Sequence, residues 1–179
     1  MPAIGDAAGG ACESEPDIEP PLRLHLDVVH DAGDWSAFPE VDMALQKVAA
    51  ALDRHPAIRL IPSRACVALS SADVVRRLNR EFRGQDKPTN VLSFPATQAG
   101  TMDSQQLGDV VLAAEVVLAE AGEAGIRPLH HLQHLLAHGL LHLLGYVHET
   151  DDEAAEMERL EVEVLGQIGV ADPYCRNRA

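Results

Sequence analysis

The segment that most constrains the fold of this chain is the run HGLLHLLGYVH at residues 138–148. Its first two histidines, His138 and His142, are four residues apart in an apolar helical pattern, so both imidazoles lie on one face of a helix. Gly145 is the residue type that lets a chain leave a helix through a left-handed conformation and turn back. A reversal at this glycine brings His148 over the same face. The run therefore predicts a helix that ends in a cluster of three histidines.

Three histidine nitrogens and one open position are typical of a catalytic zinc site, whereas structural zinc sites usually have four ligands, often cysteines. The three cysteines of the chain, Cys12, Cys66 and Cys175, are far apart and form no C-x-x-C pair, so we expect no cysteine-based site. We predict one zinc or similar divalent ion per chain on the three histidines. Such an ion acts as a Lewis acid and lowers the pKa of bound water toward about 7.

A second pair of histidines on the same helix competes for this role. Histidines recur at every fourth position, at His130, His134, His138 and His142, with His131 beside the first. Each step drifts by about 40° around the helix, so the four cannot all face one ion. We favour His138 and His142 over His134 and His138, because only the former pair lies within reach of a returning His148. His134 then lies behind the ligands or in the core, and the first two histidines lie near the start of the helix.

The rest of the chain alternates between the two-residue period of strands and the longer period of helices. We expect strands over residues 22–29, 65–69, 91–94 and 107–113, and helices over 39–54, 70–82, 114–124, 128–144 and 151–168. This order, with short connections, predicts a single α/β (α+β) domain over residues 22–175, with four strands and about five helices. Residues 1–21 are rich in Gly, Ala, Pro and acids, and we expect them to form a disordered acidic extension.

The composition indicates a cytoplasmic protein without a membrane partner. No apolar stretch approaches the roughly 20 residues of a membrane span. The first 20 residues contain five acids and no Lys or Arg, which is unlike a signal peptide. Few and scattered cysteines are typical of a reducing compartment.

The charge of the chain leaves its partner open. A net charge of −14 opposes nucleic-acid binding, because phosphate contacts supply most of that affinity. However, residues 53–87 contain eight basic and four acidic side chains, whereas residues 149–163 contain eight acids and one arginine. An acidic domain can therefore still present a basic face. Ordinary solvent-exposed helix faces, without a partner, explain these counts of charged residues equally well.

Two familiar zinc hydrolase patterns are absent from the histidine helix. Metalloproteases of the H-E-x-x-H type place a glutamate base directly after the first histidine, where this chain has Gly139. No carboxylate occurs between His131 and Glu149, so the helix supplies no base. The H-x-E and P-C-x-x-C elements of zinc deaminases are also missing.

The histidine run resembles the H-G-x-L-H-L-x-G-Y-D-H signature of the YbeY-type endoribonucleases, the bacterial ribosomal RNA maturation factors. Residues 78–94 resemble that family's L-N-x-x-x-R-x-K-D-x-P-T-[ND]-V-L-S-F block. Residues 107–111 resemble its L-G-D-[IV]-x strand, and residues 156–161 and 172–174 resemble its C-terminal helix and tail. The resemblance covers about residues 24 to 175, with its four blocks in the same order.

The resemblance implies specific site residues and a specific function. His138, His142 and His148 are the implied zinc ligands, and Arg83 is the implied residue essential for RNA cleavage. The implied activity is single-strand-specific endonucleolysis in 3′ maturation of small-subunit ribosomal RNA and in ribosome quality control. The implied partners are RNA, the small ribosomal subunit and proteins of ribosome assembly. The implied fold is a small mixed sheet of strands packed with helices, with the metal site at the end of the central histidine helix.

Two positions depart from the family pattern. Val147 replaces an Asp beside the ligands, and Gln85 replaces a Lys. An Asp there orients imidazoles, so its loss is expected to affect metal affinity or the pKa of bound water. The missing Lys removes one phosphate contact, although Lys87 lies nearby.

The residues leave the chemistry and two other functions open. The nucleophile is either activated water or the RNA 2′-OH, with Arg83 stabilising charge on the phosphate oxygens. Thr89 and Asn90 either contact phosphate or hold their loop. The alternative functions are a metallohydrolase of another substrate, such as a peptidase with a base from outside the helix, and a ribosome-assembly binding factor with a structural metal.

Overall fold

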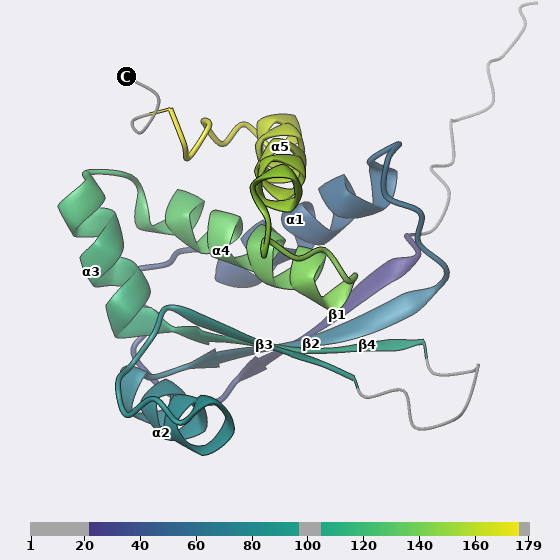
Figure 1. Cartoon of the computed structure of the whole chain (residues 1–179). Helices are drawn as coiled ribbons and strands as arrows, with labels where there is room; N and C mark the ends of the chain where they lie inside the picture. The colour runs from purple at the N-terminus through teal and green to yellow at the C-terminus, as the bar shows by residue number, and fades with distance from the viewer. Residues whose placement is uncertain (1–21, 97–104, 176–179) are drawn as a thin grey trace, which may run out of the picture.

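A computed structural model describes residues 22–96 and 105–175, and the extension expected at residues 1–21 lies outside this part. The described residues form four strands and five helices in the predicted order. Figure 1 shows the sheet running through the middle of the molecule with helices on both of its faces. The predicted α/β class is confirmed.

The sheet is mixed, as predicted. Its strands are β1 (Leu24–His30), β2 (Ser63–Ser70), β3 (Val91–Pro95) and β4 (Gln106–Ala113), in the spatial order β1-β2-β4-β3. Strands β1, β2 and β4 are parallel, whereas β3 pairs with β4 in the antiparallel direction. Strand β3 is therefore an edge strand, and one side of its backbone pairs with no strand of the described residues.

The helices divide between the two faces of the sheet (Figure 1). They are α1 (Val41–Arg54), α2 (Ala72–Arg83), α3 (Ala114–Ala124), α4 (Pro128–Leu143) and α5 (Asp151–Gln167). Helix α2 covers one face, and α3 contributes Val116 to the apolar cluster on that face. On the other face α4 lies directly on the sheet, with α1 beside it and α5 above it. No helix in residues 22–96 or 105–175 combines the length and the hydropathy that crossing a bilayer requires.

The position of α4 between the sheet and α5 follows from its sequence. Pro128 begins the helix, where a missing backbone N–H costs nothing. Nine of its sixteen residues are buried, and most of these are leucines that join the main aliphatic core. A helix that is apolar on most sides is stable only when it is covered on most sides. The histidines of α4 are therefore carried by a helix that is packed on most of its sides.

Local signals explain how α2 and α5 begin. Ser71 caps the start of α2, since its Oγ accepts a hydrogen bond of 3.4 Å from the Val74 N–H. Helix α5 starts with a capping box in which Thr150 and Glu153 each bond the backbone of the other. The T-x-x-E spacing at residues 150–153 indicates such a box, and it fixes where the chain re-enters a helix after the histidine turn.

Strand β3 sends alternate side chains to opposite faces of the sheet. Leu92 is buried with Val75 of α2, and Phe94 packs against the same cluster. Ser93 points the other way, and its Oγ donates a hydrogen bond of 3.3 Å to the carbonyl oxygen of Gly139 in α4. One short strand thus contacts α2 with one face and the histidine helix with the other.

Gly139 allows α4 to approach the sheet closely. A Cβ atom at this position would lie 2.9 Å from Val110 Cγ1 and 3.0 Å from Ser93 Oγ. These distances are below ordinary van der Waals contact, so a larger residue requires the Val110 and Ser93 side chains, or the helix, to shift. Gly139 stands where metalloproteases carry their glutamate base. Here that position faces the sheet, which leaves no room for a glutamate side chain.

Replacement of Gly139 by alanine is expected to destabilise the fold relative to the same replacement at Gly122 of α3. A Cβ on Gly122 meets no atom within 4 Å, and both variants gain similar helix propensity. Overpacking should therefore lower the free energy of unfolding of Gly139→Ala by about 1–3 kcal/mol relative to Gly122→Ala. Denaturant titration of both variants measures the difference, and equal stabilities would contradict the close packing of α4.

Candidate metal centre

The three predicted histidines come together at the end of α4. Helix α4 ends at Leu143, and Gly145 then adopts a left-handed φ of 91°, which reverses the chain. The ring centroids of His138 and His142 are 4.5 Å apart, and that of His148 lies 5.7 Å and 5.0 Å from them. One nitrogen from each ring lies within 4.8 Å of the other two. His148 reaches the helix face as the turn at Gly145 predicted.

Hydrogen bonds aim two of the imidazoles at a common point. His138 Nδ1 lies 2.8 Å from a carboxylate oxygen of Glu161, and His142 Nδ1 lies 2.9 Å from the carbonyl oxygen of Tyr146. Both oxygens accept, so both Nδ1 atoms carry the proton and both Nε2 atoms present a lone pair. These Nε2 atoms are 3.0 Å apart.

The donor set fits a metal ion. Two lone pairs at this separation repel unless a proton or a cation lies between them, and two nitrogens bound to a tetrahedral zinc are about 3.3 Å apart. The pKa of His142 is lowered, first by burial and then by the neighbouring His138, which favours the neutral imidazole that a metal requires. In the described part of the chain, this is the only group of three His, Cys, Asp or Glu residues with converging ligand atoms.

Glu161 of α5 holds the cluster from behind. The side chain is 1% exposed, and its two carboxylate oxygens accept hydrogen bonds of 2.8 Å from His138 and 2.8 Å from His134. The hydroxyl of Tyr174 donates a third bond to the carboxylate. Burial raises the pKa of Glu161, but these three bonds outweigh burial and lower it to about 2. His134 therefore lies behind the ligands, which is one of the two places expected for it.

The sequence pattern of α5 contains a signal for Glu161 that ligand spacing alone misses. The buried positions of α5 recur at helical spacing, at Met157, Leu160, Glu161, Val164 and Leu165. Four of these residues are apolar, so a carboxylate on this stripe must have partners inside the protein. An acid at a core position of an amphipathic helix is thus a local indication of a buried polar network. Tyr174 has no comparable local signal.

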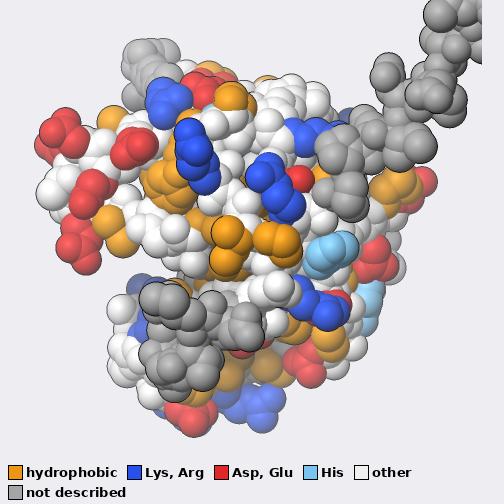
Figure 2. Space-filling model, turned by 90° about the vertical axis from the view of Figure 1, so that its right-hand side faces the viewer, with side chains coloured by type: hydrophobic (Ala, Val, Ile, Leu, Met, Phe, Trp, Pro, Cys, Tyr) orange, Lys and Arg blue, Asp and Glu red, His pale blue; other side chains and the backbone are white. Residues whose placement is uncertain are grey.

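The histidine cluster opens into a cavity of about 390 Å³ that also reaches α2 and β3. Its lining consists of Arg83, Val91, Ser93, Pro95, His138, His142, Tyr146, Val147 and His148. Figure 2 shows a notch at the left of the surface, beneath the helical layer. None of the described residues lining this cavity is a carboxylate, so no glutamate or aspartate base faces it there.

Arg83 reaches this cavity from the far end of α2. It is the last residue of that helix, and the chain leaves through Gly84 in a left-handed conformation. Its Nη2 donates a long hydrogen bond of 3.5 Å to the carbonyl oxygen of Ser93. No salt bridge to a described residue neutralises the guanidinium. The structure thus brings Arg83 and the three histidines to one cavity, although they are distant in the sequence.

Asn90 holds the loop between α2 and β3. Its Nδ2 donates hydrogen bonds of 3.2 Å and 2.9 Å to the two carboxylate oxygens of Glu120. Its Oδ1 accepts a bond of 2.7 Å from the Val91 N–H. These contacts give Asn90 the loop-holding role, one of the two left open for it. Of the two departures from the family pattern, Val147 lies in the cavity wall and Gln85 is exposed in the loop.

Comparison with known proteins agrees with the resemblance seen in the motifs. The sequence model of a family described as Endoribonuclease YbeY matches residues 40–169, which contain Arg83 and the three histidines. An Endoribonuclease YbeY of Azorhizobium caulinodans is 43% identical over 157 residues, covering 84% of this chain and 96% of that protein. That of Rhodospirillum rubrum is 40% identical over 189 residues, covering 99% and 94%. That of Sinorhizobium medicae is 43% identical over 159 residues, covering 84% and 95%.

Removal of the Tyr174 hydroxyl is expected to destabilise the fold. Tyr174→Phe takes one hydrogen bond from the buried Glu161 carboxylate, which should lower the free energy of unfolding by about 1–3 kcal/mol. Tyr146→Phe is the matched control, because the hydrogen bonds of Tyr146 to described residues all come from its backbone. Denaturant titration compares the two variants. If both are as stable as the parent protein, the hydroxyl contributes nothing to the network.

Proposed function

Since the chain belongs to the YbeY family of endoribonucleases, we propose that its RNA substrate is single-stranded and that it acts in 3′ maturation of small-subunit ribosomal RNA and in ribosome quality control. The observation that carries this proposal is the shared cavity of the histidine cluster and Arg83. A metal site next to an exposed guanidinium suits a phosphodiester, which needs its oxygens bound and its charge neutralised.

In this proposal His138, His142 and His148 hold one zinc ion. When bound, the ion supplies Lewis-acid chemistry and an activated water in the cavity. The protein contributes the orientation of the ligands: Glu161 and the Tyr146 carbonyl keep the Nδ1 atoms protonated, so that both Nε2 atoms face the cavity. Val147 offers no oxygen acceptor, so these two oxygens are the acceptors that the described residues provide for the Nδ1 atoms.

Arg83 binds the phosphate in this proposal. Its planar guanidinium can bond two phosphate oxygens at once, and this matches the charge that builds up on them during cleavage. The long bond of 3.5 Å to the Ser93 carbonyl places the side chain beside β3, at the cavity, before RNA arrives. The histidine cluster and Arg83 line one cavity of about 390 Å³, which supports a single strand that places one phosphate there over a duplex read across its minor groove.

The nucleophile determines the ends of the products. If the RNA 2′-OH attacks, the upstream fragment ends in a 2′,3′-cyclic phosphate. If water attacks, one fragment carries a terminal monophosphate instead. The absence of a carboxylate from the described cavity lining is compatible with either route, and mapping of both new RNA ends distinguishes them.

The proposed partners and location follow from the proposed substrate. RNA, the small ribosomal subunit and proteins of its assembly are the partners, and the cytoplasm is where the small subunit matures in bacteria. The two described cysteines, Cys66 and Cys175, are unpaired, which supports a reducing compartment. Co-sedimentation of the protein with small subunits tests this part.

Loss of His142 is expected to remove the metal and the nuclease activity together. The zinc affinity of His142→Ala should fall by more than the roughly 10–100-fold that loss of a ligand's hydrogen-bonded neighbour costs. His130→Ala is the matched control, because His130 lies in the first turn of α4 and outside the cluster. Elemental analysis and cleavage of a labelled single-stranded RNA are the measurements. Full zinc content in His142→Ala would contradict the ligand assignment.

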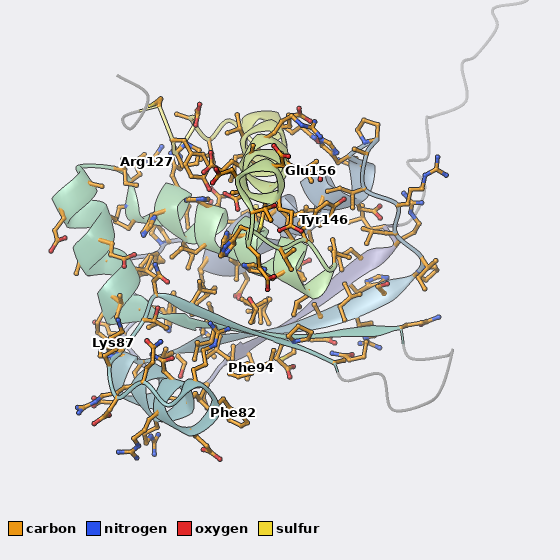
Figure 3. The ribbon with its side chains drawn as sticks, viewed as in Figure 1. Phe82, Lys87, Phe94, Arg127, Tyr146 and Glu156 are labelled. Atoms are coloured by element: carbon orange, nitrogen blue, oxygen red, sulfur yellow. The ribbon has the colours of Figure 1, made fainter. Side chains whose placement is uncertain are left out.

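Loss of Arg83 is expected to stop cleavage while the metal stays bound. Removal of one charged donor to the reacting phosphate should lower kcat by about 10²–10³-fold. Arg83→Lys should restore only part of it, because an ammonium group lacks the planar fork. Arg127→Ala, an exposed arginine at the opposite end of α4 (Figure 3), is the control. Cleavage at the parent rate by Arg83→Ala would remove Arg83 from the chemistry.

A further inference from the structure

An exposed aromatic ring lies directly beside Arg83. Phe82, the residue before it in α2, is 62% exposed, more than any other aromatic residue among the described large hydrophobic side chains. Its ring packs edge-on against Phe94 of β3, with centroids 5.2 Å apart and an angle of 68° between the planes. Figure 3 shows the two rings side by side on the α2 side of the sheet. Phe94 thus holds the Phe82 ring in place and leaves much of it open to solvent.

The chain uses aromatic residues sparingly, which makes this exposure informative. It contains three phenylalanines, and the third, Phe38, is only 2% exposed and packs on Trp35. A single exposed apolar side chain is normal on a protein surface and needs no function. Phe82 differs from that case because its ring is braced by a second ring and because its neighbour in sequence lines the cavity.

The aromatic pair and the cavity lie on opposite faces of the same edge strand. Ser93 and Pro95 of β3 line the cavity, whereas Phe94 between them faces α2 and Phe82. No strand in the described part of the chain covers the outer edge of β3. An extended polymer that leaves the cavity over this edge therefore meets Arg83 first and Phe82 next.

The charges around the cavity favour a path of the RNA from the cavity toward α2. Arg76, Arg80 and Arg83 recur at i, i+4 and i+7, so they form a basic stripe along one face of α2. Asp86 neutralises Arg76, while Arg80 and Arg83 form no salt bridge with a described residue. On the opposite side of the cavity, the first turn of α5 is acidic, and Figure 2 shows acidic side chains gathered on the helical layer beside the notch. Phosphates are repelled from α5 and attracted to α2.

We propose that Phe82, braced by Phe94, is a base-stacking residue that takes an unpaired base of the RNA next to the phosphate bound by Arg83. This inference rests on the proposed RNA substrate. An exposed phenyl face stacks on any base, and an adjacent guanidinium fixes the neighbouring phosphate, which is how single strands are held without reading their sequence. Stacking requires an unpaired base, so a site that includes Phe82 binds single-stranded RNA more tightly than duplex RNA.

The test measures steady-state cleavage of a labelled single-stranded RNA by the zinc-loaded full chain. Phe82→Ala should raise KM by about tenfold and leave kcat within about twofold, since one base–aromatic stack is lost. Phe82→Trp should restore KM, because indole also stacks. Leu118→Ala is the matched control, an exposed apolar residue of α3 away from the cavity (42% exposed).

A scan with single abasic nucleotides separates stacking from a structural effect. With the parent protein, removal of one particular base near the cleaved bond should raise KM about as much as Phe82→Ala does. With Phe82→Ala, removal of that base should have no further effect. The inference is overturned if the KM of the parent protein rises equally on every abasic RNA. It is also overturned if Phe82→Ala leaves KM unchanged. So does a Phe82→Ala variant that loses only binding to a protein partner.

Failure of this inference can be told apart from failure of the proposed function. If the parent protein cleaves the RNA and Phe82→Ala has the same KM, only the stacking role is lost. If the zinc-loaded parent protein cleaves no single-stranded RNA, the proposed function itself is wrong. Thermal denaturation of each variant shows that it is folded, as expected for substitutions of exposed side chains.

Discussion

A carboxylate almost without contact to solvent joins the parts of this molecule that form the site. Glu161 of α5 bonds His138 and His134 of α4 through its two oxygens, and Tyr174 of the C-terminal segment donates to it as well. A buried carboxylate that lost such partners would cost about 3–5 kcal/mol, so α5 and the segment up to Tyr174 must dock on α4 in a single arrangement. The same bond keeps the proton on His138 Nδ1, so that Nε2 presents its lone pair to the cluster. One interaction therefore both docks α5 and prepares the candidate metal ligands.

The edge strand β3 shows how the cavity can stay open without inviting another strand. Residues 90, 92, 94 and 96 of this segment bond β4, so the backbone groups of Val91 and Ser93 point outward. Such groups on an exposed edge are a template for unwanted strand pairing. Here the Asn90 side chain bonds the outward Val91 N–H, and Arg83 bonds the outward Ser93 carbonyl. The side chains that protect the edge come from the loop and helix just before it, and one of them is the arginine that faces the cavity.

Much of the fold could be predicted from the sequence because the relevant signals are local. Strand and helix periodicity and the turn at Gly145 each depend on a few neighbouring residues, and the structure has them where they were expected. The three-histidine cluster follows for the same reason, since its members lie within eleven residues. The approach of Arg83 to this cluster depends on the strand order β1-β2-β4-β3 and on the edge position of β3, which no local pattern specifies. Only the family resemblance indicated Arg83 as a site residue. The role of Glu161 as the partner of His138 and His134 is apparent only from tertiary contacts.

The acidic character of the chain constrains how an RNA-cleaving site of this kind can work. A net charge of −14 repels a polyanion at long range, but at physiological ionic strength charges farther apart than about 8 Å are largely screened. In the proposed complex, a phosphate in the cavity therefore responds mainly to nearby groups. Of these, Arg83 lines the cavity and Arg80 lies one turn earlier on α2, and neither forms a salt bridge with a described residue. If these two arginines make the phosphate contacts, little of the affinity comes from released counterions. The remainder must come from contacts that salt does not weaken, such as metal coordination in the cavity and stacking of bases on an exposed ring. An acidic protein with a small basic stripe can therefore bind RNA when its site combines metal coordination with base stacking.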